Sequence, residues 1–237
     1  MSITAKVSIG WQKQPEKLNI QGEIERAIEE VTGEKVELYA SGRTDAGVHS
    51  FGQTANFKIE NSIPIEKIPL ALNSKLKKTI VIQSAEEVDD NFHARFNCKG
   101  KKYRYVINNS LCGSAIFRDF EYHLPLKLDI DKMKEAAKFF IGEHDFKAFK
   151  ASGTSSKSSV RIIYNIEIKQ DEDRITIEYT GNGFLYNMVR ILTGTLVDVG
   201  LGKTRPEEIP EIIESKDRSK AGKTLPAHGL YLVEVYY

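Results

Sequence analysis

The stretch VELYASGRTDAGVHSFGQTANFKI (residues 36–59) sets an acidic loop between two strand-like runs. Gly42 and Gly47 lie close on either side of Asp45. Glycine lets a chain turn sharply and lets its backbone approach a ligand closely. The stretch therefore predicts a strand, a protruding loop that carries one carboxylate, and a second strand.

The segments around this loop predict one α+β half. Upstream, Ile24, Ala27, Ile28 and Val31 recur at helical spacing, and Gly33 can end that helix. The other expected elements are a short strand at residues 7–11, strands at 36–40, 53–59 and 79–84, and a helix over 65–76. This order of strand, helix, strand, strand, helix and strand is the split βαβ arrangement of a ferredoxin-like unit.

The rest of the chain predicts a second α+β half. Asp129 can cap a helix that Gly142 stops, with an apolar stripe of Met133, Ala136, Ala137, Phe140 and Ile141. Around a QDED turn, a hairpin is indicated by the alternation of Ile162, Tyr164, Ile166, Ile168, Ile175, Ile177 and Tyr179. Further elements are a strand at 101–107, a surface loop over 151–159, a helix over 185–197 and a closing strand over 229–237. We expect two tandem ferredoxin-like or RRM-like halves with antiparallel sheets, residues 1–100 and 101–237.

Composition indicates an ordinary globular protein with no dominant charge. Of 237 residues, 34 are Lys or Arg and 33 are Asp or Glu, so the net charge of +1 neither favours nor excludes a polyanionic partner. Two cysteines are too few for a disulfide scaffold or a zinc cluster and fit a reducing cytosol. The sequence shows no signal peptide and no apolar run near the roughly 20 residues that cross a bilayer. We expect a cytoplasmic protein that is not inserted in a membrane.

Asp45 allows three interpretations. Its carboxylate can simply bond the neighbouring backbone in an Asx-turn, which is common for such a sequence. A metal site with His49 would need a third and a fourth ligand, and no other His or Cys cluster stands nearby, so we expect no metal. The third interpretation is a reactive carboxylate presented to a substrate.

The segment NFHARFNCKGKKYRYVI (residues 91–107) interleaves cations with aromatic rings. The cations are Arg95, Lys99, Lys101, Lys102 and Arg104, and the rings are Phe92, Phe96, Tyr103 and Tyr105. Cations neutralise phosphates and rings stack on bases, so the mixture suits single-stranded or flipped nucleotides. An amphipathic strand with an aromatic core face and a solvated basic face explains the same pattern, and both interpretations can hold together.

In the segment GNGFLYNMVRILTGTLVDVG (residues 181–200), Arg190 lies on a predominantly apolar helix. A dinucleotide fingerprint fails here, because Tyr186 stands where the pattern needs glycine. A guanidinium in apolar surroundings must reach solvent or meet an anion. The candidate anions are a structural carboxylate, a phosphate and Asp45.

Four blocks together resemble the tRNA pseudouridine synthase A family. They are SGRTDAGVHSFGQTANF, FHARFNCKGKKYRYVI, GNGFLYNMVRILTGTL and AGKTLPAHGLYL, in this order and spacing, and GWQKQPEKLNIQGEIERAI matches as well. The start departs from the family pattern, since only MSITAKVSI precedes GWQ where the family has a longer strand with an Asp-Gly turn. The resemblance implies a pseudouridine synthase fold with an active-site cleft between the two halves. It also implies a homodimer that isomerises uridine in the anticodon stem-loop of tRNA, without cofactor or metal.

The resemblance also implies roles for single residues. Asp45 would be the catalytic carboxylate, Arg190 its ion-pair partner, and Tyr103 the active-site tyrosine with Leu230 as the apolar contact beneath it. Arg43, Lys101, Lys102 and Arg104 complete the expected substrate-binding set.

The implied reaction breaks the bond from ribose C1′ to uracil N1 and joins C5 to C1′, so no redox cofactor is needed. A carboxylate can attack C1′ or stabilise the cationic sugar, or it can help to form a glycal by deprotonation at C2′. Two other functions are open: a non-catalytic RNA-binding protein with two RRM-like units, and a nucleoside hydrolase or glycosylase.

Overall fold

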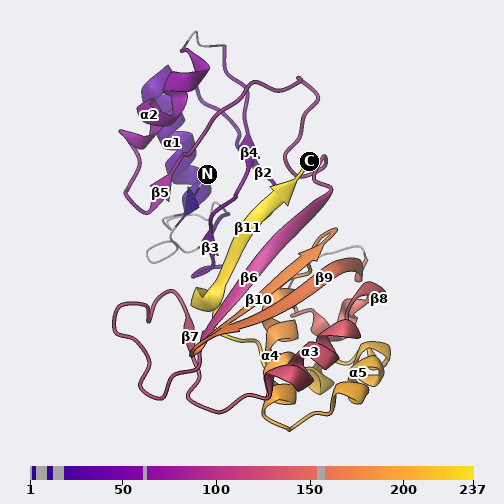
Figure 1. Cartoon of the computed structure of the whole chain (residues 1–237). Coiled ribbons are helices and arrows are strands. Elements are labelled where there is room, and N and C mark those ends of the chain that lie inside the picture. The colour runs from indigo at the N-terminus through magenta and orange to yellow at the C-terminus, as the bar shows by residue number, and fades with distance from the viewer. Residues whose placement is uncertain (1, 4–9, 13–18, 61–62, 154–157) are drawn as a thin grey trace. The chain divides into compact units, whose positions relative to one another are not determined.

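The computed structural model of the chain describes residues 2–3, 10–12, 19–60, 63–153 and 158–237. These residues form helices and sheets in which most strand pairs are antiparallel and a few are parallel, which confirms the α+β class (Figure 1). Internal contacts divide the chain into two compact units, residues 1–99 with 231–237, and residues 100–230. The closing strand, predicted for the second half, thus joins the first unit from residue 231 onward.

The first unit contains two helices and several short strands. In chain order its elements are β1 (Ser2–Ile3), α1 (Ile20–Thr32), β2 (Tyr39–Ala40), β3 (His49–Ser50), β4 (Ala55–Asn56), a 3-10 turn (Ile65–Lys67), α2 (Ile68–Asn73), β5 (Ile80–Val81) and β11 (Leu230–Tyr236). Strands β5, β1, β3 and β11 are bonded in that order, and β11 runs parallel to β3. β2 and β4 form a separate antiparallel pair.

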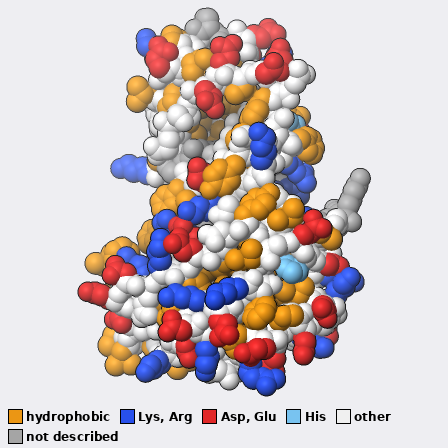
Figure 2. All heavy atoms as spheres, turned by 45° about the vertical axis from the view of Figure 1, so that its right-hand side comes forward, with side chains coloured by type: hydrophobic (Ala, Val, Ile, Leu, Met, Phe, Trp, Pro, Cys, Tyr) orange, Lys and Arg blue, Asp and Glu red, His pale blue; other side chains and the backbone are white. Residues whose placement is uncertain are grey.

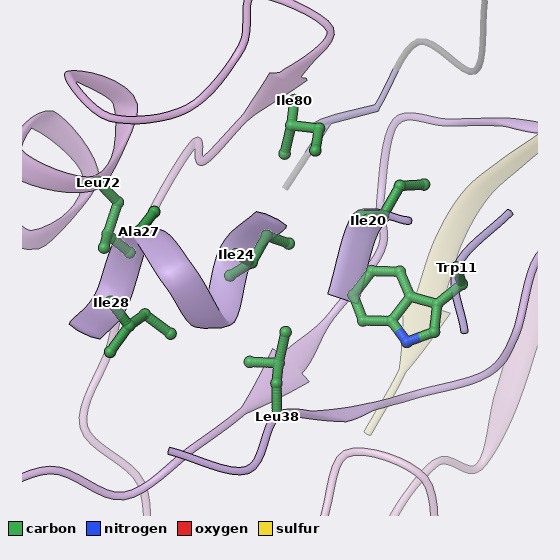
Figure 3. Packing of buried hydrophobic residues seen from close by; sticks show 8 residues of the cluster. All are labelled: Trp11, Ile20, Ile24, Ala27, Ile28, Leu38, Leu72 and Ile80. Atoms are coloured by element: carbon green, nitrogen blue, oxygen red, sulfur yellow. The ribbon is translucent and has the colours of Figure 1, made fainter. Parts of the chain in front are cut away.

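Helix α1 carries the core of this unit. Asn19 caps it by accepting a hydrogen bond from Gly22 N at 2.8 Å, and Gly33 ends it in the left-handed conformation at φ 78°. The predicted end is therefore confirmed, and the helix begins at Ile20. Its buried face packs with residues from four other segments, as Figure 3 shows. The cluster consists of Trp11, Ile20, Ile24, Ala27, Ile28, Leu38, Leu72 and Ile80.

The strands of the first unit are shorter than the sequence predicts. The runs at 36–40, 53–59 and 79–84 each contain a strand of two residues. β2 pairs with β4 at only two positions, and β5 pairs with β1 at only two. The helix predicted over 65–76 is a 3-10 turn followed by α2, which has Pro69 in its first turn, where a missing N–H costs nothing. The strand predicted at 7–11 lies partly outside the described residues. Trp11 itself is buried and its N–H donates to Thr44 O at 3.1 Å.

The second unit is a sheet with helices beside it. Its elements are β6 (Gly100–Asn108), β7 (Tyr122–His123), α3 (Ile130–Lys138), β8 (Gly142–Asp145), β9 (Val160–Asp171), β10 (Arg174–Gly181), α4 (Met188–Gly200) and α5 (Ile209–Ser215). Its 3-10 turns span Phe146–Phe149, Pro206–Glu208, Arg218–Lys220 and Ala227–Gly229. Strands β8, β9, β10 and β6 are bonded in that order, all antiparallel, and β7 runs parallel to β6. Helices α3, α4 and α5 lie together on the same side of the β9–β10 hairpin (Figure 1).

The predicted β9–β10 hairpin is present, but its alternation changes phase at a bulge. Ile163 is buried, whereas the predicted inward residue Tyr164 is 52% exposed. Thr180 lies opposite Asn165 and the next residue, Gly181, lies opposite Ile163, so Tyr164 is the extra residue. Beyond the bulge the predicted inward residues are buried: Ile166, Ile168, Ile175, Ile177 and Tyr179.

Helix α3 begins as predicted and ends earlier. Asp129 accepts a hydrogen bond from Lys132 N at 3.1 Å, which confirms the cap. The predicted end at Gly142 is wrong, because the helix stops at Lys138. The N–H groups of Phe139, Phe140 and Ile141 reach carbonyls only three residues back, which tightens the chain out of the α-helical path. The surface loop predicted at 151–159 lies in part outside the described residues. No helix in the described ranges has the length and apolar character needed to span a bilayer.

Helix α4 lies in close contact with the backbone of residues 222–225. It begins at Met188, three residues after the predicted start, and nearly all its residues are buried. Gly222 N donates to Thr195 Oγ1 at 2.9 Å, and Leu225 N donates to Arg190 O at 3.3 Å. A methyl group at Gly194 would overlap the carbonyl oxygen of Lys223. The contact is therefore backbone on backbone and needs glycine.

Gly194→Ala should destabilise the protein although alanine favours helices. The added methyl meets a backbone oxygen, which cannot rotate away, so we expect the free energy of unfolding to fall by about 2 kcal/mol. Gly183→Ala is the matched control, because its methyl would meet only the Arg161 side chain at 3.7 Å. Urea denaturation measures both. Equal free energies of unfolding for the two variants would show that residues 222–225 can move away from the added methyl group at no cost.

Candidate functional site

Neighbouring segments hold the backbone of the Asp45 loop. Val48 N donates to Asp45 O at 3.1 Å, which closes the turn. Gly10 packs against the loop so closely that a methyl there would lie 3.1 Å from Thr44 O and 3.2 Å from Ala46 N. Asp45 remains partly exposed beside the buried Thr44. The loop is therefore a fixed turn that presents a carboxylate at the surface of the first unit.

A buried glutamine supports the start of this loop. Gln53 is 1% exposed; its Oε1 accepts from Ser41 Oγ at 2.6 Å, and its Nε2 donates to Gly42 O at 2.9 Å. Both contacts lie immediately before Arg43, which is exposed. Gln53 was not among the residues predicted from the sequence. A polar residue in an otherwise strand-like run after a glycine-rich loop was the available signal.

His49 is a packing residue of the first unit. It is 3% exposed and stacks on Tyr231 with ring centroids 5.0 Å apart. Tyr231 in turn stacks on Phe51 at 5.3 Å. Within the described ranges, no three His, Cys, Asp or Glu residues are grouped so as to hold a metal ion. Ring stacking beside the β3–β11 pair accounts for the position of His49.

Two tyrosines of β6 in the second unit have different surroundings. Tyr103 is partly exposed and meets Phe184 edge to face, with centroids 5.2 Å apart. Tyr105 is fully buried and its hydroxyl donates to Pro226 O at 2.7 Å. Burial raises the pKa of Tyr105 far above its ordinary value, so its hydroxyl stays protonated. Of the two, Tyr103 is the residue with part of its surface exposed.

Lys102 and Arg104 lie on the opposite face of β6, where both pair with Glu178. Lys102 Nζ lies 2.6 Å from Glu178 Oε2, and Arg104 Nη2 lies 2.7 Å from Oε1. Burial opposes ionisation of Glu178, but hydrogen bonds from the two cations outweigh it and hold the pKa of this carboxyl below its ordinary value. The strand is thus amphipathic, with part of its basic face neutralised internally. Contact of Lys102, Arg104 or Lys101 with RNA stays a prediction.

The surface of the protein shows no broad field of one sign on the face drawn in Figure 2. Basic and acidic side chains are interspersed there over most of the surface. This agrees with the net charge of +1. Binding of a polyanion would therefore depend on local groups rather than on a general attraction.

Two neutral oxygens orient the Arg190 guanidinium within the second unit. Its Nε donates to Leu225 O at 2.6 Å, and Nη1 donates to Asn187 Oδ1 at 2.7 Å. Asn187 has a left-handed backbone at φ 59°, immediately before α4 begins. The glycine-dependent contact of 222–225 with α4 brings the Leu225 carbonyl into place. The direction of this side chain therefore depends on two segments that the sequence does not link.

The turn before Leu230 packs on Tyr105. A methyl at Gly229 would lie 2.8 Å from the Tyr105 ring, and Leu230 is buried. His228 in this turn is partly buried, and burial lowers its pKa, as does the positive charge of Arg190. The charge of Asp119 and a hydrogen bond with the Glu121 backbone act in the opposite direction. No sequence signal distinguished His228 from the other histidines.

The predicted site residues fall into two groups. Arg43 and Asp45 belong to the first unit, while Lys101, Lys102, Tyr103, Arg104, Arg190 and Leu230 belong to the second. In the second unit, Tyr105 and residues 225–229 connect the surroundings of Arg190 with those of Leu230.

Comparison with known proteins identifies the family. Residues 8–97 and 136–237 match the family model described as tRNA pseudouridine synthase. The chain belongs to this family. It is 53% identical to tRNA pseudouridine synthase A of Acetivibrio thermocellus over 96% of this chain and 93% of the relative. The protein of the same name from Caldicellulosiruptor saccharolyticus is 54% identical with the same coverage. A tRNA pseudouridine synthase A 2 of Clostridium tetani is also 54% identical, again over 96% of this chain and 93% of the relative. The resemblance seen in the sequence is confirmed.

His228 should make stability depend on pH. Its pKa is lower in the folded chain than the ordinary value of about 6.5, so the unfolded chain takes up the proton first as the pH falls. The contribution of His228 to the free energy of unfolding should therefore be constant above about pH 6.5. It should decrease as the pH falls from about 6.5 to the lower pKa of the folded chain. Urea denaturation at pH 7.5 and pH 5.5 should show a smaller decrease in His228→Gln than in the wild type. His144→Gln, in strand β8, is the control, and a decrease in His228→Gln as large as in the wild type would contradict the assignment.

Proposed function

We propose that this protein is an enzyme that isomerises uridine to pseudouridine in tRNA. The observation that carries the proposal is the identity of 53–54% with proteins named tRNA pseudouridine synthase A, over 96% of the chain. We extend the proposal to the anticodon stem-loop as the substrate region and to a homodimer in the cytoplasm as the working form. These finer points follow from the family resemblance.

Asp45 is the proposed catalytic carboxylate. The reaction cleaves C1′–N1, rotates the base and forms C5–C1′, so positive charge develops on the sugar. A carboxylate stabilises that charge, either by attack at C1′ or along the glycal route. A hydrolytic glycosidase normally works with two carboxylates and a water. A single carboxylate on a fixed turn supports an isomerase, which must keep water from C1′.

Arg190 is the proposed partner of Asp45. A nearby cation lowers the pKa of a carboxyl and keeps it ionised. The guanidinium is already oriented by Leu225 O and Asn187 Oδ1, and this supports a role that requires a fixed direction. Arginine offers a planar fork for a carboxylate, which lysine cannot reproduce.

Tyr103, Leu230 and the basic residues are the proposed contacts to the nucleotide. A paired base cannot be reached inside a stem and must be flipped out. The partly exposed ring of Tyr103 can stack on uracil. Its hydroxyl can relay the proton from C5, accepting it while giving up its own proton, so that one proton leaves C5 and one is available to N1. Arg43 stands exposed on the same loop as Asp45, where it can contact the RNA strand. Lys101, Lys102 and Arg104 are proposed to meet phosphates, the last two in competition with Glu178.

Incubation with a uridine-labelled tRNA transcript tests the function. Wild-type protein should form pseudouridine without releasing free uracil. Asp45→Asn should abolish turnover and leave tRNA affinity within a few-fold, because phosphate contacts dominate binding. Release of uracil would favour a hydrolase or glycosylase, and binding without product would favour a non-catalytic RNA-binding protein. Substantial turnover by Asp45→Asn would remove Asp45 from the mechanism.

Tyr103→Phe and Tyr103→Leu should behave differently. Phe keeps the ring and loses the hydroxyl, whereas Leu loses both. We expect Phe to bind tRNA normally and to stall after C1′–N1 cleavage. We expect Leu to bind about tenfold more weakly, which lies within the roughly 1–3 kcal/mol that base stacking contributes. Single-turnover kinetics and fluorescence anisotropy measure the two effects. Normal turnover by Phe would reduce Tyr103 to a stacking surface.

A further inference from the structure

The second unit contains a pocket that the proposed mechanism does not use. Its volume is about 540 Å³, within the range of pockets that hold small ligands. The lining comes from the loop between β6 and β7, from β7 itself and from the turn before Leu230. The lining includes Cys112, Ala115, Arg118, Tyr122, His123 and His228.

The loop that forms one wall is anchored at its base. Glu121 is 5% exposed, and its carboxylate accepts from Asn108 Nδ2 at 2.7 Å and from Arg174 Nε at 3.2 Å. This carboxylate is therefore neutralised and adds little repulsion toward an anion. His123 Nε2 is hydrogen-bonded to Ser110 O at 2.9 Å, and Gly113, at φ 69°, lies directly against the His123 ring. The wall is formed in the absence of a ligand.

The chemistry of the lining fits a nucleotide. Tyr122, His123 and His228 contribute rings to the lining, and rings of this kind stack on bases. The Asn108 amide is already bonded to Glu121 and Ser110. Arg118 provides an exposed guanidinium, whose Nη1 donates to Ala115 O at 2.9 Å and whose Nε lies 3.9 Å from Asp119 Oδ2. Arginine pairs favourably with phosphate because its fork matches two oxygens. Flat rings beside one exposed guanidinium suit a base with its phosphate better than an apolar ligand.

The pocket adjoins the surroundings of Arg190 within the same unit. Pro226 lines the pocket, and its carbonyl accepts the Tyr105 hydroxyl. His228 lines it as well and is close enough to Arg190 for their charges to interact. The turn that contains Pro226 and His228 thus connects the pocket with the surroundings of Arg190.

We infer that the pocket holds a nucleotide of the RNA that neighbours the target uridine, with its base against the rings and its phosphate at Arg118. The inference rests on the proposed function and adds a second contact to it. A nucleotide held here would fix the register of the strand, so that one particular uridine is presented for isomerisation.

A cysteine in the lining provides a direct test. The chain has two cysteines, Cys98 and Cys112, so Cys98→Ser leaves Cys112 as the only thiol. The full chain with Cys98→Ser and Asp45→Asn is mixed with a tRNA transcript, and binding is followed by fluorescence anisotropy. The rate at which N-ethylmaleimide alkylates Cys112 should fall about tenfold at saturating tRNA, as expected if stacking worth about 1–3 kcal/mol fills the pocket.

A neighbouring thiol outside the pocket is the matched control. Leu111 is 83% exposed and does not line the pocket. In the chain with Asp45→Asn, Cys98→Ser, Cys112→Ser and Leu111→Cys, the alkylation rate should change by less than about twofold on tRNA binding, since this thiol lies outside the pocket that the base would fill. Equal protection of both thiols would mean that RNA only covers the loop, and this would overturn the inference. An unchanged rate of Cys112 alkylation with tRNA bound would overturn it too. Protection that increases with protein concentration in the absence of RNA would indicate a contact between two copies of the chain, and this would also overturn the inference.

A bulky side chain at the rim gives a second measurement. Ala115→Trp would occupy the pocket and should weaken tRNA binding about tenfold, whereas Leu111→Trp, on the same loop outside the pocket, should bind tRNA like wild type. Equal affinities of the two variants would contradict the inference. The proposed function is tested separately, by pseudouridine formation in the wild-type protein. If tRNA protects Cys112 but the wild-type protein forms no pseudouridine, the nucleotide site stands and the isomerase proposal fails. If pseudouridine forms but Cys112 is not protected, the isomerase proposal stands and the nucleotide site fails.

Discussion

The approach of residues 222–225 to helix α4 is the constraint on which the second unit depends. The two backbones lie so close that neither Gly194 nor Gly222 has space for a methyl group. This contact places Leu225 O on the Arg190 guanidinium and leads directly into Pro226, whose carbonyl receives the Tyr105 hydroxyl. A buried hydroxyl without such a partner would cost about 1–3 kcal/mol. The packing of glycine on helix thus fixes the side chain of Arg190 and the turn that ends at Leu230.

The charges near the proposed site are balanced locally rather than globally. Glu178 neutralises part of the charge on Lys102 and Arg104, and Glu121 is neutralised by Arg174. Such pairs hold strands and loops in place, but they also reduce the attraction for a polyanion. A protein with a net charge of +1 therefore has to recognise RNA through shape, stacking and a few well-placed cations. Rings near exposed arginines, as at Arg118, suit that mode of recognition.

The Asp45 loop and the Arg190 helix, which belong to different units, are both held in place by neighbouring residues. In each, a charged side chain with a proposed catalytic role is carried by a segment that neighbouring groups hold in place. Gln53 and Gly10 hold the first, while Asn187 and Leu225 hold the second. A side chain held in its working direction before the substrate arrives loses less conformational entropy on binding. These supporting residues do not carry the chemistry, yet the geometry of the proposed mechanism depends on them.

The sequence by itself determined the α+β class, the family, the helix cap at Asp129, the helix end at Gly33 and the hairpin that ends at Gly181. These features are local: caps, turns and period-two alternation are written within a few adjacent residues. The sequence did not determine the bulge at Tyr164, the early end of α3, or the return of residues 231–237 to the first unit. Nor did it show that Lys102 and Arg104 share Glu178, or that Leu225 orients Arg190. Each of these depends on which distant segments lie side by side, and only the packed tertiary structure decides that, because hydrogen bonds and ion pairs between segments depend on distance in space and not on separation along the chain.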